Sequence, residues 1–238
     1  MGFSITDNTA DAWNGEGFFK DEGKIQDIRN VAAIFPYASH LVVNADSKID
    51  NIEDLRGKKV SPGAKGLSSD LEFQRLLNLY GMSYDDLKVQ FLSFDDAAQQ
   101  FTDGHLDCLA FMVTPPPFAP IINVASQRNI KLLSIPEDKI AELDKFQGID
   151  SYTIPANIYQ GVDYPVKGIT ARGHIFVRED MPEDIVYNIT KTIAENFDRY
   201  GDVISNMKYL TQEELAADVG IPFHPGALKY YKEKGWVK

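Results

Sequence analysis

The sequence predicts an α/β fold with two domains, and two observations lead to this prediction. Patterns typical of strands and helices alternate along most of the 238 residues, as in folds built on a largely parallel sheet. After the last strand pattern, at 169–177, only helical patterns follow. One domain inserted into another explains this order, so we expect domain I to comprise 1–38 and 172–238 and domain II to comprise 39–171. The chain would then pass between the two domains twice. Two such connections would form a hinge beside an inter-domain cleft, where ligand sites are common.

The elements follow from hydrophobic periodicity and from capping residues. Strands are expected at 3–5, 28–35, 41–43, 59–61, 89–92, 106–113, 130–135 and 169–177, with a break at Pro36 and Tyr37. Helices are expected at 10–13, 50–55, 68–80, 95–101, from Thr114 onwards, and at 137–146, 182–200, 212–218 and 225–234, whereas 148–167 reads as irregular. Asp50, Ser68 or Ser69, Ser93 and Thr114 are the expected N-caps.

Composition excludes several classes of function. The formal charge of −11 and the absence of a basic cluster argue against nucleic acid as a partner. No apolar run approaches the roughly 20 residues of a membrane-spanning helix, so the chain is not expected to span a membrane. The N-terminus shows no export signal, and we expect a periplasmic location only if a full-length precursor carries one. We also expect a monomer.

Cysteine and histidine give no sign of a metal or a cofactor. The single cysteine, Cys108, lies in an apolar segment and cannot form an intramolecular disulfide. The four histidines, His40, His105, His174 and His224, have no metal-binding spacing. We therefore expect no metal, no cofactor and a buried cysteine.

The glycine-rich loop that precedes the expected helix at Ser68 is the strongest candidate site. Glycines let a backbone approach a ligand, and the first turn of a helix offers N–H groups and a dipole that favour an anion. The loop Gly63–Ser69 matches neither a Walker loop nor a GxGxxG motif. An ordinary strand-to-helix turn with a serine N-cap would show the same pattern.

Two further segments could line a site. Thr114 and Pro115 follow a buried strand, at the end where α/β sheets place ligands, but they also suit a simple helix start. Tyr159 lies in an aromatic and polar stretch that could cover a small ligand or could merely be half-buried. No nucleophile elbow, cysteine–histidine pair or acid–base carboxylate pair is found, so we expect no enzyme.

Over essentially its whole length the chain resembles the TAXI-type substrate-binding subunits of TRAP transporters. The resemblance lies in Ile5-Thr6-Asp7, Asn14-Gly15, the run 54–60, the loop Gly63–Ser69, the strand 106–113 and the segment 155–161. It implies a type II periplasmic-binding fold that closes on a small organic anion, such as glutamate or 2-oxoglutarate, and delivers it to TRAP membrane permease subunits. Members of that family begin with a signal peptide and about two further βα units.

The resemblance also places the ligand contacts. The family's Gly-Ser-Gly-Thr-like loop falls on Gly66, Leu67, Ser68 and Ser69, where Leu67 replaces the usual serine. Position and resemblance together add Asp7, Tyr37, Thr114, Pro115 and Tyr159. Two alternatives share the fold: the ligand-sensing domain of a regulator, and an enzyme such as a deaminase.

Overall fold

The computed structural model describes residues 1–114, 116–203 and 211–237. The chain divides into two compact units, which are described separately. Unit 1 contains 1–36, 147–149 and 171–238, and unit 2 contains 37–146 and 150–170. The domain division expected from the sequence stays a prediction, and Pro115 lies outside the described residues.

Unit 2 is built on strands whose middle member, β5 (Cys108–Val113), is buried along its whole length. It pairs in parallel with β3 (Lys59–Ser61) and antiparallel with the second half of β2 (Ile28–Asn44). The other strands are β4 (Lys88–Val89), parallel to β3, β6 (Ile130–Leu132), paired with β2, β7 (Ile149–Ile154), and the start of β8 (Val166–Arg178), which pairs with β7.

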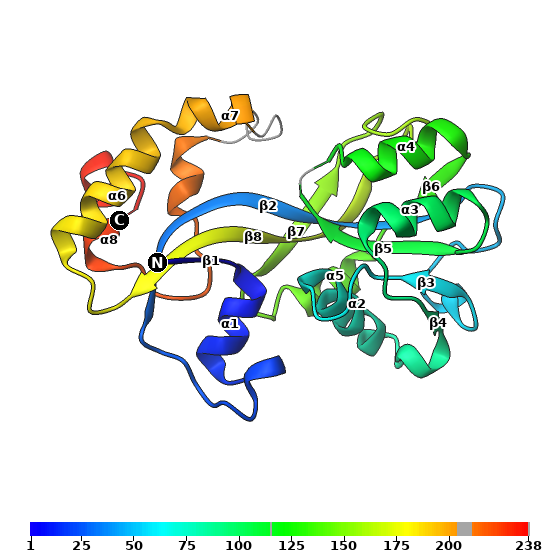
Figure 1. Ribbon diagram of the computed structural model, residues 1–238, viewed down its shortest axis with the longest axis horizontal. Helices are drawn as coiled ribbons and strands as arrows, with labels where there is room; N and C mark the ends of the chain where they lie inside the picture. The colour runs from blue at the N-terminus through cyan, green and yellow to red at the C-terminus, as the bar shows by residue number, and fades with distance from the viewer. Residues whose placement is uncertain (115, 204–210, 238) are drawn as a thin grey trace. The chain divides into compact units, whose positions relative to one another are not determined.

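The helices of unit 2 follow its strands along the chain (Figure 1). They are α2 (Ser68–Leu79), α3 (Phe94–Thr102), α4 (Ala119–Gln127) and α5 (Glu137–Leu143), with 3-10 turns η2 (Glu53–Leu55) and η3 (Tyr84–Asp86). The core between α3, α4 and the sheet includes Val42, Phe101, Leu109, Phe111 and Ile121.

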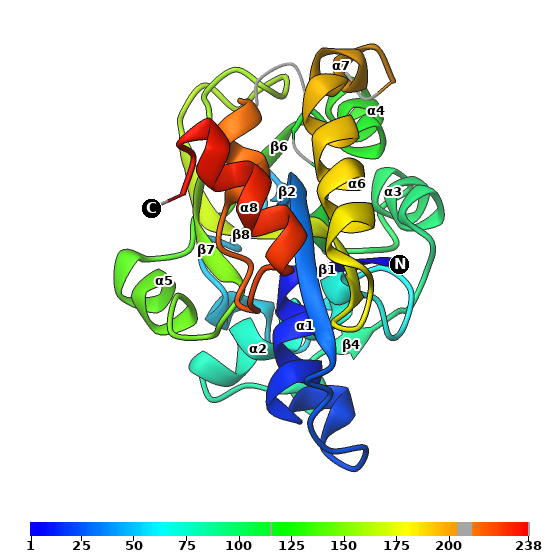
Figure 2. The ribbon, with the colours of Figure 1, turned by 90° about the vertical axis from the view of Figure 1, so that its left-hand side faces the viewer.

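In unit 1, β1 (Gly2–Ile5) pairs antiparallel with the second half of β8, Ile5 facing Gly173. α1 (Thr6–Asn14) follows, and Gly15 ends it in the left-handed conformation. The C-terminal helices α6 (Glu183–Glu195) and α8 (Pro225–Lys234) lie side by side (Figure 2). The remaining elements are η1 (Gly17–Phe19), η4 (Phe197–Arg199), α7 (Tyr200–Val203) and η6 (Gln212–Ala216).

The predicted α/β class is confirmed, and several elements need correction. The break expected at Pro36 is wrong, because β2 runs through it as one strand. The paired residues of β2 and β5 begin only at Ala38, so the missing N–H of Pro36 interrupts no bond between these strands. The stretch 148–167 contains β7 and is not irregular throughout. The expected helix at 212–218 is a 3-10 turn. No helix in the described ranges is long and apolar enough to cross a bilayer.

Candidate functional site

The carboxyl ends of three parallel strands meet at one edge of unit 2. In the register of β3 with its neighbours, Val60 faces Val89 of β4 and Cys108 of β5. The loops that follow these strands therefore leave the sheet at the same edge, which is where α/β sheets hold their ligands. This edge brings together the loop before α2, the start of α3 and the segment that begins at Thr114.

The loop before α2 is shaped by two glycines. Gly63 and Gly66 have φ values of +93° and +83°, in the region that side chains rarely adopt. A Cβ on Gly63 would lie 2.7 Å from the ring of Phe94 at the start of α3, so no larger residue fits without movement. The Leu92 N–H donates to Gly63 O at 3.2 Å. The glycine-rich loop is thus fixed against the start of α3.

The start of α2 differs from the expected serine cap. Leu67 is the N-cap and has no side-chain capping bond, so the expected N-cap at Ser68 or Ser69 is wrong. The Ser69 hydroxyl donates to Ala110 O at 3.2 Å and accepts from Met112 N at 2.8 Å. These two hydrogen bonds of the Ser69 hydroxyl join α2 to β5. What α2 can offer a ligand at Ser68 and Ser69 is its first-turn N–H groups and its dipole.

Asp70 places a negative charge in this same turn. Its carboxylate accepts from the Gly66 N–H at 2.8 Å and from the Tyr84 hydroxyl at 2.6 Å. Burial and this bond to Asp70 raise the pKa of Tyr84, which stays protonated. Because the Leu67 N–H donates to Ala64 O at 3.3 Å, the amides of Gly66 and Leu67 are both used within the loop. The first-turn amides that follow in the chain are those of Ser68 and Ser69.

One cation lies on this loop. Lys65 Nζ is 5.8 Å from the centroid of the Phe91 ring, within the range of a cation–π contact. Phe91 in turn contacts Tyr84 edge to face, with centroids 5.9 Å apart. Leu67 beside them is 44% exposed. The loop therefore presents a lysine and an apolar side chain outwards.

Thr114 lies at the expected edge but not at a helix start. It is half-buried and follows β5 directly, whereas α4 begins at Ala119 with Phe118 as its N-cap. The expected helix start at Thr114 is therefore wrong. The Pro116–Pro117 peptide bond is cis, and the proline in the first turn of α4 is Pro120. Thr114 thus belongs neither to β5 nor to α4.

Tyr159 is buried, and its hydroxyl is hydrogen-bonded within the protein. Only 3% of it is exposed, and its hydroxyl lies 2.9 Å from His40 Nε2 and accepts from the Phe118 N–H at 2.9 Å. His40 Nδ1 lies 2.9 Å from Ala38 O, which can only accept, so Nε2 accepts the Tyr159 proton. Burial lowers the pKa of His40 to about 4, which keeps the ring neutral. Tyr159 thus supports the start of α4.

The two remaining candidates belong neither to the loop before α2 nor to the segment after β5. Tyr37 begins the unit 2 part of β2 and is half-buried, which raises its pKa. Asp7 belongs to unit 1, in the first turn of α1, where it is fully buried and where the helix dipole favours its charge. Within unit 2, the loop Gly66–Ser69 follows β3 and Thr114 follows β5, and these parallel strands end at the same edge of the sheet.

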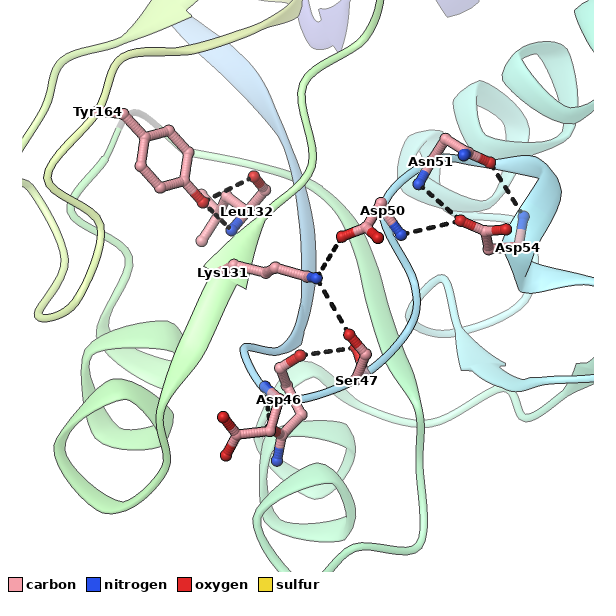
Figure 3. A network of polar contacts seen from close by, with 9 residues as sticks. Asp46, Ser47, Asp50, Asn51, Asp54, Lys131, Leu132 and Tyr164 are labelled. Carbon is pink, nitrogen blue, oxygen red and sulfur yellow. Dashed lines mark hydrogen bonds and ion pairs between the residues drawn. The ribbon is translucent and has the colours of Figure 1, made fainter.

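A polar network at the opposite edge of unit 2 has a structural role. Lys131 Nζ donates to Ser47 O at 3.2 Å and to the Asp50 carboxylate at 2.6 Å (Figure 3). Asp50 is paired with this lysine, and the N-cap of η2 is Ile52, so the predicted N-cap at Asp50 is wrong. Val43 of β2 faces Cys108, the first residue of β5, so this network lies away from the carboxyl ends of β3 and β5. Within the described ranges, no cluster of three metal-binding side chains is found.

Sequence reasoning missed Asp70 and Tyr84. Asp70 in the first turn of a helix has the pattern of an ordinary dipole-favoured acid, and nothing local shows that it turns back to Gly66. Tyr84 lies fourteen residues further on, in η3. Only the fold brings these two side chains to the loop.

Comparisons with known proteins place the chain as follows. A sequence model described as the NMT1-like family matches residues 1–235. Among solved structures, the chain is similar to a protein from Bordetella bronchiseptica RB50, with 14% identity, a TM-score of 0.51, and coverage of 96% of this chain and 64% of that one. It is also similar to the periplasmic aliphatic sulphonate binding protein of Escherichia coli, with 20% identity, a TM-score of 0.49, and coverage of 95% and 69%.

A third similar structure is the alkanesulfonate-binding protein from Xanthomonas axonopodis pv. citri bound to MOPS. Identity is 16%, the TM-score is 0.46, and the match covers 92% of this chain and 64% of that one. The chain thus spans about two thirds of the length of these proteins. At 14% identity, the similarity to the Bordetella bronchiseptica protein concerns the fold alone.

Proposed function

Because the chain belongs to the NMT1-like family, we propose that it is a solute-binding protein that captures a small carboxylate and delivers it to a membrane permease. The observation that carries the proposal is the edge of unit 2 where β3, β4 and β5 end, beside the first turn of α2. In the proposed site, the amides of Ser68 and Ser69 receive the carboxylate, and Thr114 lines the same edge. The role requires binding without catalysis.

The residues around α2 restrict the solute. Asp70 already balances part of the positive end of the helix dipole and occupies the Gly66 amide, so a highly charged phosphate is disfavoured. A single carboxylate needs fewer donors, and Lys65 adds a positive charge on the same loop. Leu67 offers apolar contact to the body of the solute. Amino acids such as glutamate and dicarboxylates such as 2-oxoglutarate have this combination of groups.

The permease and the location are part of the same proposal. The resemblance to TAXI-type subunits favours a TRAP permease as the partner and the periplasm as the place of work. A gene for a multi-span TRAP permease beside that of this protein would support this. A neighbouring pair of ABC permease and ATPase genes would contradict the TRAP assignment and leave the solute-binding role intact.

Thermal unfolding and calorimetry with a panel of solutes test the proposal. The panel contains glutamate, 2-oxoglutarate, succinate, an aliphatic sulfonate and a neutral sugar. A solute at a hundredfold excess over its Kd stabilises the folded chain by about 2.7 kcal/mol. For a chain of this size that raises Tm by roughly 5–10 °C. We expect a carboxylate to give this shift. A shift with the sulfonate alone would contradict the carboxylate assignment, and no shift with any solute would contradict the function.

A further inference from the structure

Arg172, in the unit 1 part of β8, differs from the other arginines of the chain. All seven arginines lie in the described residues. Six of them donate at least one side-chain hydrogen bond, namely Arg29, Arg56, Arg75, Arg128, Arg178 and Arg199. Within the described residues, no atom accepts a hydrogen bond from the side chain of Arg172, although its Nη1 is shielded from solvent. A guanidinium has five donors, and a buried donor without an acceptor destabilises the folded state.

Glu214 does not accept a hydrogen bond from Arg172. Its Oε1 lies 3.5 Å from Arg172 Nη1, which gives an ion pair without a hydrogen bond. Its Oε2 accepts from the Thr211 N–H at 2.8 Å in the capping box of η6, which holds the carboxylate in place. Because the side chain of Arg172 is 21% exposed, a part of the guanidinium can still be reached from solvent.

Arg172 also lies beside the first turn of α1. Its backbone N–H donates to Thr6 Oγ1 at 2.9 Å, and Thr6 is the first residue of that helix. Ile5, the N-cap, provides no side-chain capping bond. The fully buried Asp7 already places a carboxylate in this turn, so a second anion would have to be held by Arg172 and not by the helix dipole alone.

We propose that Arg172 is an anion-binding residue of unit 1. Its ligand is an oxyanion with two oxygens that can face the guanidinium fork, which is the geometry of a carboxylate, a sulfonate or sulfate. Such an anion would supply the acceptors that Arg172 lacks in the described structure. It comes either from an organic acid or from a free inorganic anion. The inference concerns unit 1 and stands independently of the α2 edge of unit 2.

Titration of the full chain with sodium sulfate and with sodium succinate, at constant ionic strength in sodium chloride, tests this inference. The readout is the side-chain Nε–H resonance of Arg172 by NMR, together with the Kd. We expect one or both anions to shift this resonance. Arg172→Gln should weaken the Kd roughly ten- to hundredfold, as expected for a charge-assisted hydrogen-bonded pair. Binding by sulfate alone indicates an inorganic anion, and binding by succinate alone indicates an organic acid.

Two variants serve as controls. Arg178→Gln, on the same strand and in ion pairs with Asp27 and Asp180, should leave the Kd unchanged. Arg172→Lys keeps the charge without the fork and should bind with intermediate affinity, which preserves the test if Arg172→Gln fails to fold. An Arg172 resonance that neither anion moves, or equal affinity of wild type and Arg172→Gln, would overturn the inference. Solute binding at the α2 edge, measured by the panel above, could still hold.

Discussion

Replacing Tyr159 with phenylalanine removes the hydroxyl that joins His40 to the start of α4. The change keeps the ring, which packs in the core of unit 2 and contacts His40 edge to face at 5.7 Å. It leaves two groups without their partner: His40 Nε2, fully buried, and the Phe118 N–H, partly buried. No other described group bonds to His40 Nε2, and water has no direct access to it.

The magnitude follows from the number of groups left without a partner. A buried polar group that loses its hydrogen bond costs about 1–3 kcal/mol. Two such groups, one of them partly exposed, give a loss of about 2–4 kcal/mol for Tyr159→Phe. With an m-value of about 2 kcal/mol per molar urea, the unfolding midpoint falls by about 1–2 M.

Urea unfolding followed by circular dichroism measures this loss. Trp13 and Trp236 both belong to unit 1, so tryptophan fluorescence reports separately on that unit. Tyr152→Phe is the matched control, because Tyr152 is half-buried against the same core and its hydroxyl has no hydrogen-bond partner within the described residues. We expect the control to stay within about 0.5 kcal/mol of wild type. A loss below 0.5 kcal/mol for Tyr159→Phe would refute the assignment of its hydroxyl to His40 and Phe118.

Two other predictions concern stability. Burial lowers the pKa of His40 and of His174 to about 4, so the unfolded chain binds protons at these sites that the folded chain does not. Stability should therefore fall as the pH drops from about 6.5 to 4, by up to about 2.7 kcal/mol per pH unit for the two rings together, as urea titrations across this range would measure. Gly148→Ala should destabilise unit 1 by more than Gly23→Ala in thermal unfolding. Both glycines have positive φ, but only at Gly148 would the new Cβ clash, 2.7 Å from the Thr6 backbone. Equal losses would contradict the close contact.

Local patterns were sufficient for the elements with strong caps and clear periodicity. Ser93 accepts from the Asp96 N–H at the start of α3, as the sequence predicts. The strand around Cys108 is buried throughout, as its uninterrupted apolar run indicates. In these cases the residues that decide the structure lie within one helical turn or one strand of each other.

The sequence predictions that were wrong or incomplete have a different physical origin. Pro36 and Thr114 carry local signals for a break and a helix start, but tertiary pairing of β2 and the Tyr159 bond to Phe118 outweigh them. The loop before α2 was identified from its glycines, whereas the use of its amides by Asp70 depends on a side chain four residues away that turns back. Arg172 could have been noticed as a charge within the apolar strand pattern 169–177.

The central claim is that the first turn of α2 receives the anionic group of the solute. Leu67→Glu places a carboxylate at this turn, and Ile122→Glu, at an equally exposed position of unit 2 on α4, is its matched control, since both side chains are 44% exposed. Repulsion between the added charge and the bound carboxylate should cost about 1 kcal/mol or more. With the acid found by the solute panel, calorimetry should show a Kd weakened at least fivefold by Leu67→Glu and unchanged by Ile122→Glu. Equal Kd values for the two variants would contradict the claim.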